Sequence, residues 1–491
     1  MRHMRNALVI FFGFLIASTP LHADVGYSAA VPEADRLIEQ GNFKQAQSIL
    51  TWNLNDKSLS AEQRKKVEFQ IDWLERTRQD YPMTKDALFQ KLLKAVQYLT
   101  PSEFDKWVRE GRFDSRKIDG VEHYVSTSVA NLFFRHQELA YRRTEDRNHV
   151  SEQLGRLAAA RAIKMTAQAQ HTPYVLPYHL KCALDIKLDE TAAPAGETIR
   201  GWLPLPRAND HQKYIQILSS FPAKMLLASE NSPIRSAYME QKADGVNPTE
   251  FIINFTYASY GVHFEMDPAK IVPANLNDPE LKKFTSEQPH VIFNERIRKL
   301  AEDIAGKETN QMLKAKAFFD WISANIVYSY AREYSTLTNI SDYTVCNKYG
   351  DCGQEGMLFI TLCRSAGIPA RWQTGWDLWP EDHDIHDWSE IYLAPYRWIP
   401  CDPWAAIFAK QYCHALAPEE QIELRDFYFG GLDQWRMIVN SDHSQPLNPP
   451  KNSFRSDDID FQRGEFEWGN HNIYFNKYDS YKINVERMDA K

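Results

Sequence analysis

The sequence predicts an α+β protein in which helical and strand-forming stretches follow one another along the chain. Apolar residues recur at helical spacing in the first third, and alternate with polar residues, as in half-buried strands, in the middle. The last third mixes an apolar helix with further strands. The chain has 491 residues and is 43% hydrophobic, so it can bury more than one sizeable core.

The N-terminus has the form of a cleavable secretory signal, which we expect to occupy residues 1–23. Arg2 and Arg5 precede an apolar run over residues 7–17, and the segment then ends at a small residue. The run is too short to span a bilayer comfortably, although an uncleaved anchor is the alternative. We therefore expect an exported protein, periplasmic or extracellular, without an integral membrane segment after removal of the signal.

The charge balance and the cysteine content exclude several classes of function. The net charge is −8 at pH 7 and no run of lysine and arginine occurs, which argues against nucleic acid and anionic membranes as partners. Six cysteines are few for a disulfide scaffold. The sequence contains no CxxC motif, which would indicate a structural zinc site. In an oxidising compartment, a free thiol then requires either burial or chemistry.

The first two expected regions differ in their hydrophobic period. Residues 24–170 are expected to be helical, with a helix-turn-helix pair over 33–50 around a Gly41-Asn42 break and a further helix over 151–170. Residues 174–268 are expected to form a β-sandwich. In the segment that opens this sandwich, Leu180, Cys182 and Leu184 face one way, so Cys182 is expected in the core.

The remaining chain is expected to hold a linker, a second mixed region and a terminal hairpin. Residues 267–289 are rich in proline and charge and are typical of a linker. Helices resume before an α+β core that we place at 290–440. Residues 441–491 begin with a proline- and asparagine-rich stretch, and we expect them to end in a β-hairpin extension.

Cys352 lies where an apolar helix is expected to begin. Gly367 and Pro369 provide the end of that helix, because glycine tolerates the left-handed conformation and proline prevents continuation. The partial positive charge of the first turn favours a thiolate, and reactive cysteines occupy such positions. Gly353 is expected to leave room for a substrate backbone. Cys363, three turns on, is expected in the core.

A histidine and an aspartate downstream complete a nucleophilic constellation. His386 begins one expected strand and Asp402 ends the next, with a turn over residues 394–397 between them. Two antiparallel strands joined there bring His386 and Asp402 together at the ends away from the turn. A thiol nucleophile needs a histidine to exchange protons and a third group to orient the imidazole, so the three residues form a coherent set.

These motifs resemble the transglutaminase-like superfamily. G-D-C-G, the helix ending in LCRSAGIPAR, then H-x-W-x-E-x-Y-L and D-P follow one another as in that family, over about residues 296–410. The resemblance implies a papain-like core preceded here by the β-sandwich and the N-terminal helical region. It also implies that Cys352 is the nucleophile, His386 the general base and acid, and Asp402 the orienting carboxylate.

Several alternatives remain at the site. His383 competes with His386, and Asp387 competes with Asp402, although its neighbouring position on a strand points it to the opposite face. The backbone N–H of Cys352 is one candidate oxyanion donor, and the second is left open: a side chain from the preceding helix or loop, such as Tyr328 or Tyr330, is a candidate.

Other side chains near these motifs allow further roles. A metal site on the acidic loop before His386 is conceivable, but no further ligand pair accompanies it. Cys346 could pair with the nucleophile, and Cys401 with Cys413. One or two of the tryptophans gathered in this region are expected to wall a cleft.

The sequence therefore predicts an exported, cysteine-dependent amide hydrolase that acts on a peptide or protein through a thioester intermediate. No metal or organic cofactor is expected. A cross-linking protein-glutamine transglutaminase is the alternative enzyme, because the fold alone does not choose between hydrolysis and amine transfer. A non-catalytic binding protein that retains the fold is the alternative from another class.

Overall fold

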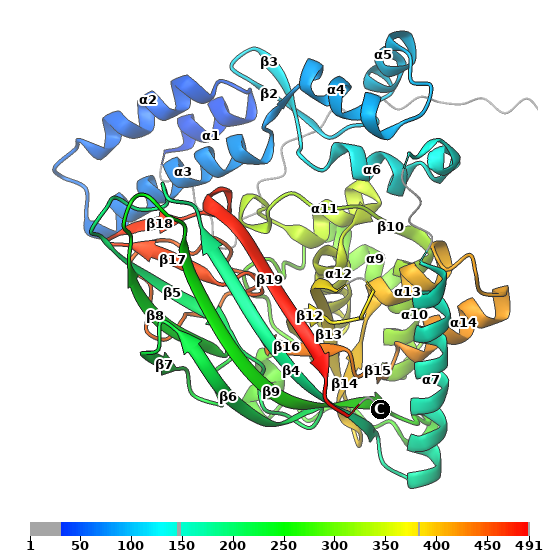
Figure 1. Cartoon of the computed structure of the whole chain (residues 1–491). Coiled ribbons are helices and arrows are strands. Elements are labelled where there is room, and N and C mark those ends of the chain that lie inside the picture. The colour runs from blue at the N-terminus through cyan, green and yellow to red at the C-terminus, as the bar shows by residue number, and fades with distance from the viewer. Residues whose placement is uncertain (1–30, 145–148, 382, 490–491) are drawn as a thin grey trace, which may run out of the picture.

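The computed structural model describes residues 31–144, 149–381 and 383–489, and it shows a mixed α+β protein. Small helices cover one end, two curved sheets form one side, and a helix-rich core with its own sheet forms the other (Figure 1). The predicted signal at 1–23 lies outside the described residues. In the described part of the chain, no helix is long and apolar enough to cross a membrane.

The N-terminal region is helical, as predicted, but it also contains a small sheet. The helix-turn-helix pair turns at Gly41, where φ is +80° and an added Cβ would lie 2.4 Å from the carbonyl oxygen of Lys117. The unpredicted sheet has the order β1-β3-β2. The elements are α1 (Pro32–Glu39), α2 (Phe43–Leu54), α3 (Ala61–Asp80), β1 (Met83–Thr84), α4 (Lys85–Ala95), α5 (Pro101–Arg109), β2 (Ser115–Ile118), β3 (Val121–Tyr124), α6 (Ser128–Arg135) and α7 (Val150–Gln170).

Two sheets pack face to face and form the β-sandwich. One sheet has the order β15-β9-β4-β19 with β6 also paired to β9, and the other has the order β18-β17-β5-β8-β7. Leu180, Cys182 and Leu184 point into the core between them, as the alternation predicts. The strands are β4 (Tyr174–Leu188), β5 (Thr198–Pro204), β6 (Gln212–Phe221), β7 (Met225–Leu227), β8 (Ser236–Lys242), β9 (Thr249–His263), β15 (Gly431–Leu432), β17 (Glu465–Trp468), β18 (His471–Ile473) and β19 (Tyr478–Arg487).

The C-terminal segment differs from the predicted hairpin extension. Strands β17 and β18 do form a hairpin, but β17 also pairs with β5, and β19 pairs along β4 from Leu188 to Leu180. Figure 1 shows β19 beside β4 for most of its length. Residues 465–487 therefore complete both sandwich sheets, because β4 and β5 would otherwise expose long unpaired edges.

The second half of the fold is a four-stranded sheet covered by helices. Its order is β14-β13-β12-β16, and apolar side chains of the helices pack against it. Trp376 of β12 and Met437 of β16 reach into the core of the sandwich, so the two halves share apolar packing. The elements are α9 (Glu295–Ala305), α10 (Gln311–Asn325), α11 (Ile340–Asn347), α12 (Cys352–Ser365), β12 (Ala370–Asp377), β13 (Asp384–Leu393), β14 (Arg397–Cys401), α13 (Pro403–Gln411), α14 (Pro418–Phe427) and β16 (Arg436–Asn440).

The segment expected as a linker is packed against this second half. Residues 267–289 include α8 (Pro279–Lys283), and Phe284 within them is buried. Val272 forms a backbone bridge to Ala394, and Arg364 of α12 donates to the carbonyl of Ser286. Proline and charge therefore mark an irregular segment here, but one that the core holds in place.

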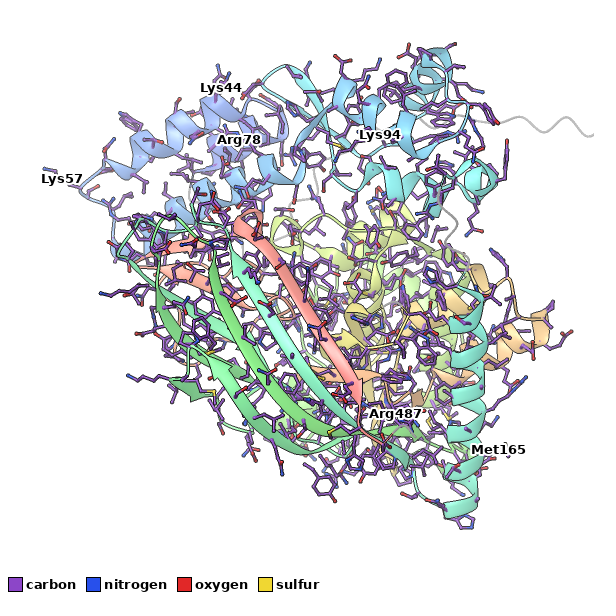
Figure 2. All side chains as sticks on the ribbon, in the orientation of Figure 1. Lys44, Lys57, Arg78, Lys94, Met165 and Arg487 are labelled. Carbon is purple, nitrogen blue, oxygen red and sulfur yellow. The ribbon has the colours of Figure 1, made fainter. Side chains whose placement is uncertain are left out.

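The N-terminal helices contact the loop that leads to Cys352. Arg135 of α6 donates to Ser329 Oγ at 2.8 Å, and Asn131 donates to the carbonyl of Tyr330 at 3.0 Å. The Phe134 ring packs against the rings of Tyr328 and Tyr330, with centroids 4.9 and 5.4 Å away. The outer side of this region faces solvent, where Lys44 and Lys57 project outward (Figure 2). Through its contacts with residues 328–330, helix α6 packs against the segment that leads to the cysteine helix.

Candidate active site

Cys352 is the first residue of α12 and is half-buried. Asp351 caps the helix: its side chain accepts from the backbone N–H of Gln354, and the Gln354 side chain accepts from the backbone N–H of Asp351. This reciprocal capping box fixes where the helix begins. The structure thus places the thiol at the helix N-terminus, as the sequence predicts.

His386 and Asp402 come together through the hairpin of β13 and β14. The strands pair from Leu393 with Arg397 to Ser389 with Cys401, and His386 Nε2 lies 2.8 Å from Asp402 Oδ2 at the open end. Both side chains are buried. Asp402 also caps α13, because its Oδ1 accepts from the backbone N–H of Ala405. The cap and the histidine together fix the orientation of this carboxyl group.

Arg436 is a site residue that the sequence analysis missed. It lies on β16, is fully buried, and its Nη1 is 3.0 Å from Asp402 Oδ2. Burial raises the pKa of the Asp402 carboxyl, but its contacts with His386 and Arg436 outweigh burial and leave this pKa below its ordinary value. Asp402 is therefore held as a carboxylate. No sequence motif marks Arg436, because its position depends on how β16 joins the sheet.

Asp387 reaches the thiol. Asp387 and His386 are neighbours on β13, so their side chains project from opposite faces of the strand. The face that carries Asp387 is the one that packs against α12. Asp387 Oδ2 is 3.9 Å from Cys352 Sγ and 3.5 Å from the hydroxyl of Tyr334. Gln462, from the loop before β17, donates to Asp387 Oδ1 at 2.7 Å and to the carbonyl of His386 at 3.2 Å. Asp387 does lie on the strand face opposite to His386, as expected from the sequence, but that face is also part of the site.

The structure joins only two of the three predicted catalytic residues by a hydrogen bond. His386 bonds to Asp402, whereas the thiol of Cys352 bonds to Asp387. Among the described residues, no hydrogen bond connects Cys352 to His386. Because Nε2 of His386 faces Asp402, the imidazole nitrogen left for proton exchange is Nδ1.

The surroundings of Cys352 favour the thiol over the thiolate. Burial raises the pKa of this group well above its ordinary value, and the nearby carboxyl groups of Asp387 and Asp351 raise it further. The backbone N–H of Asp387 acts in the opposite direction. The position at the helix N-terminus led us to expect a thiolate, but that expectation did not count burial, which is the largest cause of the raised pKa, or the nearby carboxyl groups.

Asp351→Asn is expected to make Cys352 more reactive and to flatten the pH dependence of stability. Burial raises the pKa of Asp351 from 3.8 to about 6. Its contribution to stability is therefore fully present below pH 3.8 and lost as the pH rises through 6. Asparagine caps helices as well as aspartate and cannot ionise. We expect faster alkylation of Cys352 by iodoacetamide at pH 7, and a smaller change in melting temperature between pH 4 and 7.

The control for this variant is Asp278→Asn, which changes an exposed N-cap on α8. It is expected to leave both measurements unchanged. An unchanged alkylation rate in Asp351→Asn would show that Asp351 does not govern the thiol.

Gly353 is required by its neighbours. A Cβ at this position would lie 2.1 Å from the Tyr334 hydroxyl and 2.7 Å from Asp387 Oδ2. The space that the sequence analysis assigned to a substrate backbone is thus filled by these two side chains. Gly353→Ala is expected to break the 2.7 Å hydrogen bond from Tyr334 to Asp351 and to lower the melting temperature.

Gly356→Ala in the same helix is the matched control for this variant. A Cβ there would meet its nearest neighbour at 3.7 Å, an ordinary contact. Equal melting temperatures for the two variants would contradict the assigned clash. The measurement is thermal unfolding at one pH.

Aromatic rings enclose His386. The imidazole stacks on Trp388 with centroids 5.5 Å apart, and the ring of Trp404 meets it edge-on at 4.7 Å. Trp404 is half-buried and also contacts Tyr328, so it lies on the side of His386 that faces the loop at residues 328–330. His383, the competing histidine, is exposed. Within the described ranges, no group of three histidine, cysteine or acidic side chains is placed to hold a metal ion.

The other cysteines are free thiols. Cys182, Cys363, Cys401 and Cys413 are buried, and Cys346 is exposed. Neither disulfide considered from the sequence is present: Cys346 is not joined to Cys352, nor Cys401 to Cys413.

Comparison with curated proteins finds two relatives of modest similarity. An uncharacterized protein from Haemophilus influenzae is 24% identical over 267 residues, which cover 46% of this chain and 67% of that protein. The uncharacterized protein YebA from Bacillus subtilis is 29% identical over 128 residues, or 22% of this chain. That match spans only 17% of the length of YebA.

Solved structures give distant matches. A proposed cysteine protease from Cytophaga hutchinsonii has a TM-score of 0.42 at 16% identity, covering 65% of this chain and 93% of that one. The periplasmic domain of TgpA from Pseudomonas aeruginosa has a TM-score of 0.27 at 13% identity, covering 53% of this chain and 94% of that one.

The core around Cys352 and His386 also matches a family model. The match runs over residues 298–403, which span α10, the cysteine helix and the hairpin that ends at Asp402. This chain therefore contains a domain of the transglutaminase-like superfamily over residues 298–403.

Proposed function

We propose that the protein is an exported cysteine-dependent amide hydrolase in which Cys352 is the nucleophile, His386 the general base and acid, and Asp402 the orienting carboxylate. The observation that carries this proposal is the buried contact of 2.8 Å between His386 and Asp402, at the open end of a hairpin beside the cysteine helix. Arg436 keeps Asp402 ionised, and the Asp402 carboxylate can then hold the His386 imidazole in one tautomer.

The proposed reaction begins from a neutral thiol. Asp402 accepts the Nε2 hydrogen of His386 and leaves a lone pair on Nδ1. In the proposed step, Nδ1 of His386 accepts the thiol proton of Cys352 when substrate enters. Sulfur then attacks the amide carbonyl. His386 returns the proton to the leaving amine, a thioester forms, and water activated by the same imidazole hydrolyses it.

A neutral resting thiol fits an enzyme in an oxidising compartment. A thiolate is the form that oxidants attack, so a thiol that ionises only when substrate is present is protected between turnovers. The predicted signal at 1–23 supports such a location. Trp404, which contacts His386, and Tyr328, which contacts Trp404, supply aromatic surface for a peptide substrate.

The experiment is mass spectrometry of peptide libraries incubated with the wild-type protein and with Cys352→Ala. The proposal expects new peptide ends or released amine with the wild type and none with the variant. Products that appear equally with both would refute it. A primary amine such as cadaverine, added to the same incubation, distinguishes hydrolysis from amine transfer. Its incorporation into glutamine-bearing peptides, without hydrolysis, would identify a transglutaminase instead.

A further inference from the structure

We propose that Asp387 is a catalytic residue that acts as a neutral carboxylic acid and donates a hydrogen bond to the substrate oxygen as the thiol attacks. This inference rests on the proposed function, because it assumes that Cys352 attacks a carbonyl carbon. It assigns the second oxyanion donor, for which the sequence offered Tyr328 or Tyr330.

The distance from Asp387 to the nucleophile suits this role. A donor to an oxyanion lies about 3 Å from the oxygen that carries the charge. That oxygen is bonded to the carbon under attack, so it lies close to the sulfur as well. Asp387 Oδ2, 3.9 Å from Cys352 Sγ, is within reach of such an oxygen. The backbone N–H of Cys352, at the start of α12, is the expected first donor.

Gln462 determines which oxygen of Asp387 carries the proton. Its amide nitrogen donates to Asp387 Oδ1 at 2.7 Å and to the carbonyl of His386 at 3.2 Å, and both partners are acceptors. An amide NH₂ group can only donate, so Oδ1 is the unprotonated oxygen. The hydrogen of a neutral Asp387 therefore sits on Oδ2, which faces Cys352.

The groups around Asp387 favour its neutral form. Its side chain is buried, and among the described residues no lysine or arginine forms an ion pair with it. Burial raises its pKa well above the ordinary value, and the carboxyl groups of Asp351 and Asp457 raise it further. Bonds from Thr374 and Tyr334 act in the opposite direction but do not reverse the shift. A buried carboxylic acid kept neutral in this way can serve as an oxyanion donor.

The proposed step balances without a further reactant. The sulfur electron pair forms the bond to the carbonyl carbon, and the carbonyl π pair moves onto oxygen. The proton of Asp387 stays on Oδ2 while it hydrogen-bonds to that oxygen. When the intermediate collapses, the C=O bond re-forms and the leaving group departs. Asp387 ends the step in the form in which it began.

Two reagents that attack Cys352 by different routes test this role. Acylation by p-nitrophenyl acetate passes through a tetrahedral oxyanion, whereas alkylation by iodoacetamide does not. Asp387→Ala is expected to lower the acylation rate by about 10²–10³-fold, the usual cost of one oxyanion donor, without lowering the alkylation rate. Asp387→Asn is expected to keep most of the acylation, because Gln462 holds the amide oxygen at Oδ1 and leaves the NH₂ group at Oδ2.

The pH dependence of the two labelling rates gives a second test. It compares the wild type with Asp387→Asn, a variant whose side chain has nearly the same shape. The ratio of acylation to alkylation cancels the ionisation of the thiol. In the wild type this ratio is expected to fall with rising pH as Asp387 ionises, since the donor is then lost. In Asp387→Asn the ratio is expected to stay constant.

The remaining outcomes separate the inference from the proposed function. Cys352→Ala sets the background labelling for both reagents. Acylation unchanged in Asp387→Ala overturns the inference alone and leaves Cys352 as the nucleophile. A fall of both rates in both variants assigns Asp387 as a base for the thiol, which also overturns it. Wild-type labelling at the Cys352→Ala background with both reagents overturns the proposed function itself.

Discussion

Asp402→Asn is expected to lower kcat on a peptide substrate by about 10⁴-fold while the fold persists. Asp402 Oδ2 accepts the Nε2 hydrogen of His386 in a buried contact of 2.8 Å. An asparagine would present its NH₂ group there and force the hydrogen onto Nδ1, the nitrogen that must accept the thiol proton. The substitution thus removes the base without removing the imidazole.

The fold should tolerate this change because asparagine preserves the helix cap and Arg436 keeps Asp433 and Asp377 as partners. Asp402 Oδ1 accepts from the backbone N–H of Ala405 and caps α13, and asparagine is an equally good cap. Asp433→Asn is the matched control: it removes another buried carboxyl group that contacts Arg436 but not His386. It should lower kcat far less. Equal losses of kcat in the two variants would show that the charge network, rather than the tautomer of His386, limits activity.

Arg436→Met is expected to destabilise the protein by about 3–5 kcal/mol, because it leaves buried carboxylates without their cation. Arg436 is fully buried and contacts Asp402 at 3.0 Å, Asp433 at 3.2 Å and Asp377 at 3.7 Å. Arg156 of α7 also pairs with Asp377, at 2.9 Å, but it lies 3.9 Å from Asp433. It therefore replaces Arg436 only in part.

Denaturant unfolding at two pH values measures this effect. The carboxylates that lose their cation take up protons as the pH falls, so the deficit should shrink between pH 7 and pH 4. Arg487→Met is the matched control, since Arg487 stacks on Tyr178 at the end of β19 and remains partly exposed (Figure 2). A deficit for Arg436→Met no larger than that for Arg487→Met would contradict the assigned network.

The parts of the site that the sequence could predict lie within short stretches of chain. The start of α12 at Cys352 follows from local capping residues, and the pairing of His386 with Asp402 follows from one hairpin. In both cases the residues that determine the geometry are neighbours in sequence. The α+β class was likewise predictable, because helical and strand periods occupy separate stretches.

The parts that the sequence could not predict depend on contacts between distant segments. Gln462 bonds to Asp387 across 75 residues, and Arg436 reaches Asp402 only because β16 joins β12. The pairing of β17 and β19 with the first strands of the sandwich is of the same kind. The protonation state of Cys352 depends on these contacts as well, since they bury the carboxyl groups around it.

The central claim is that Cys352 becomes acylated by the carbonyl group of an amide. The most direct measurement is intact-mass and peptide-map analysis of the wild-type protein after rapid acid quenching during peptide turnover, with His386→Gln as a companion. We predict a thioester adduct on the peptide that contains Cys352 in the wild type and its loss in His386→Gln. Turnover that proceeds without any adduct on Cys352, or with an adduct on another residue, would contradict the account.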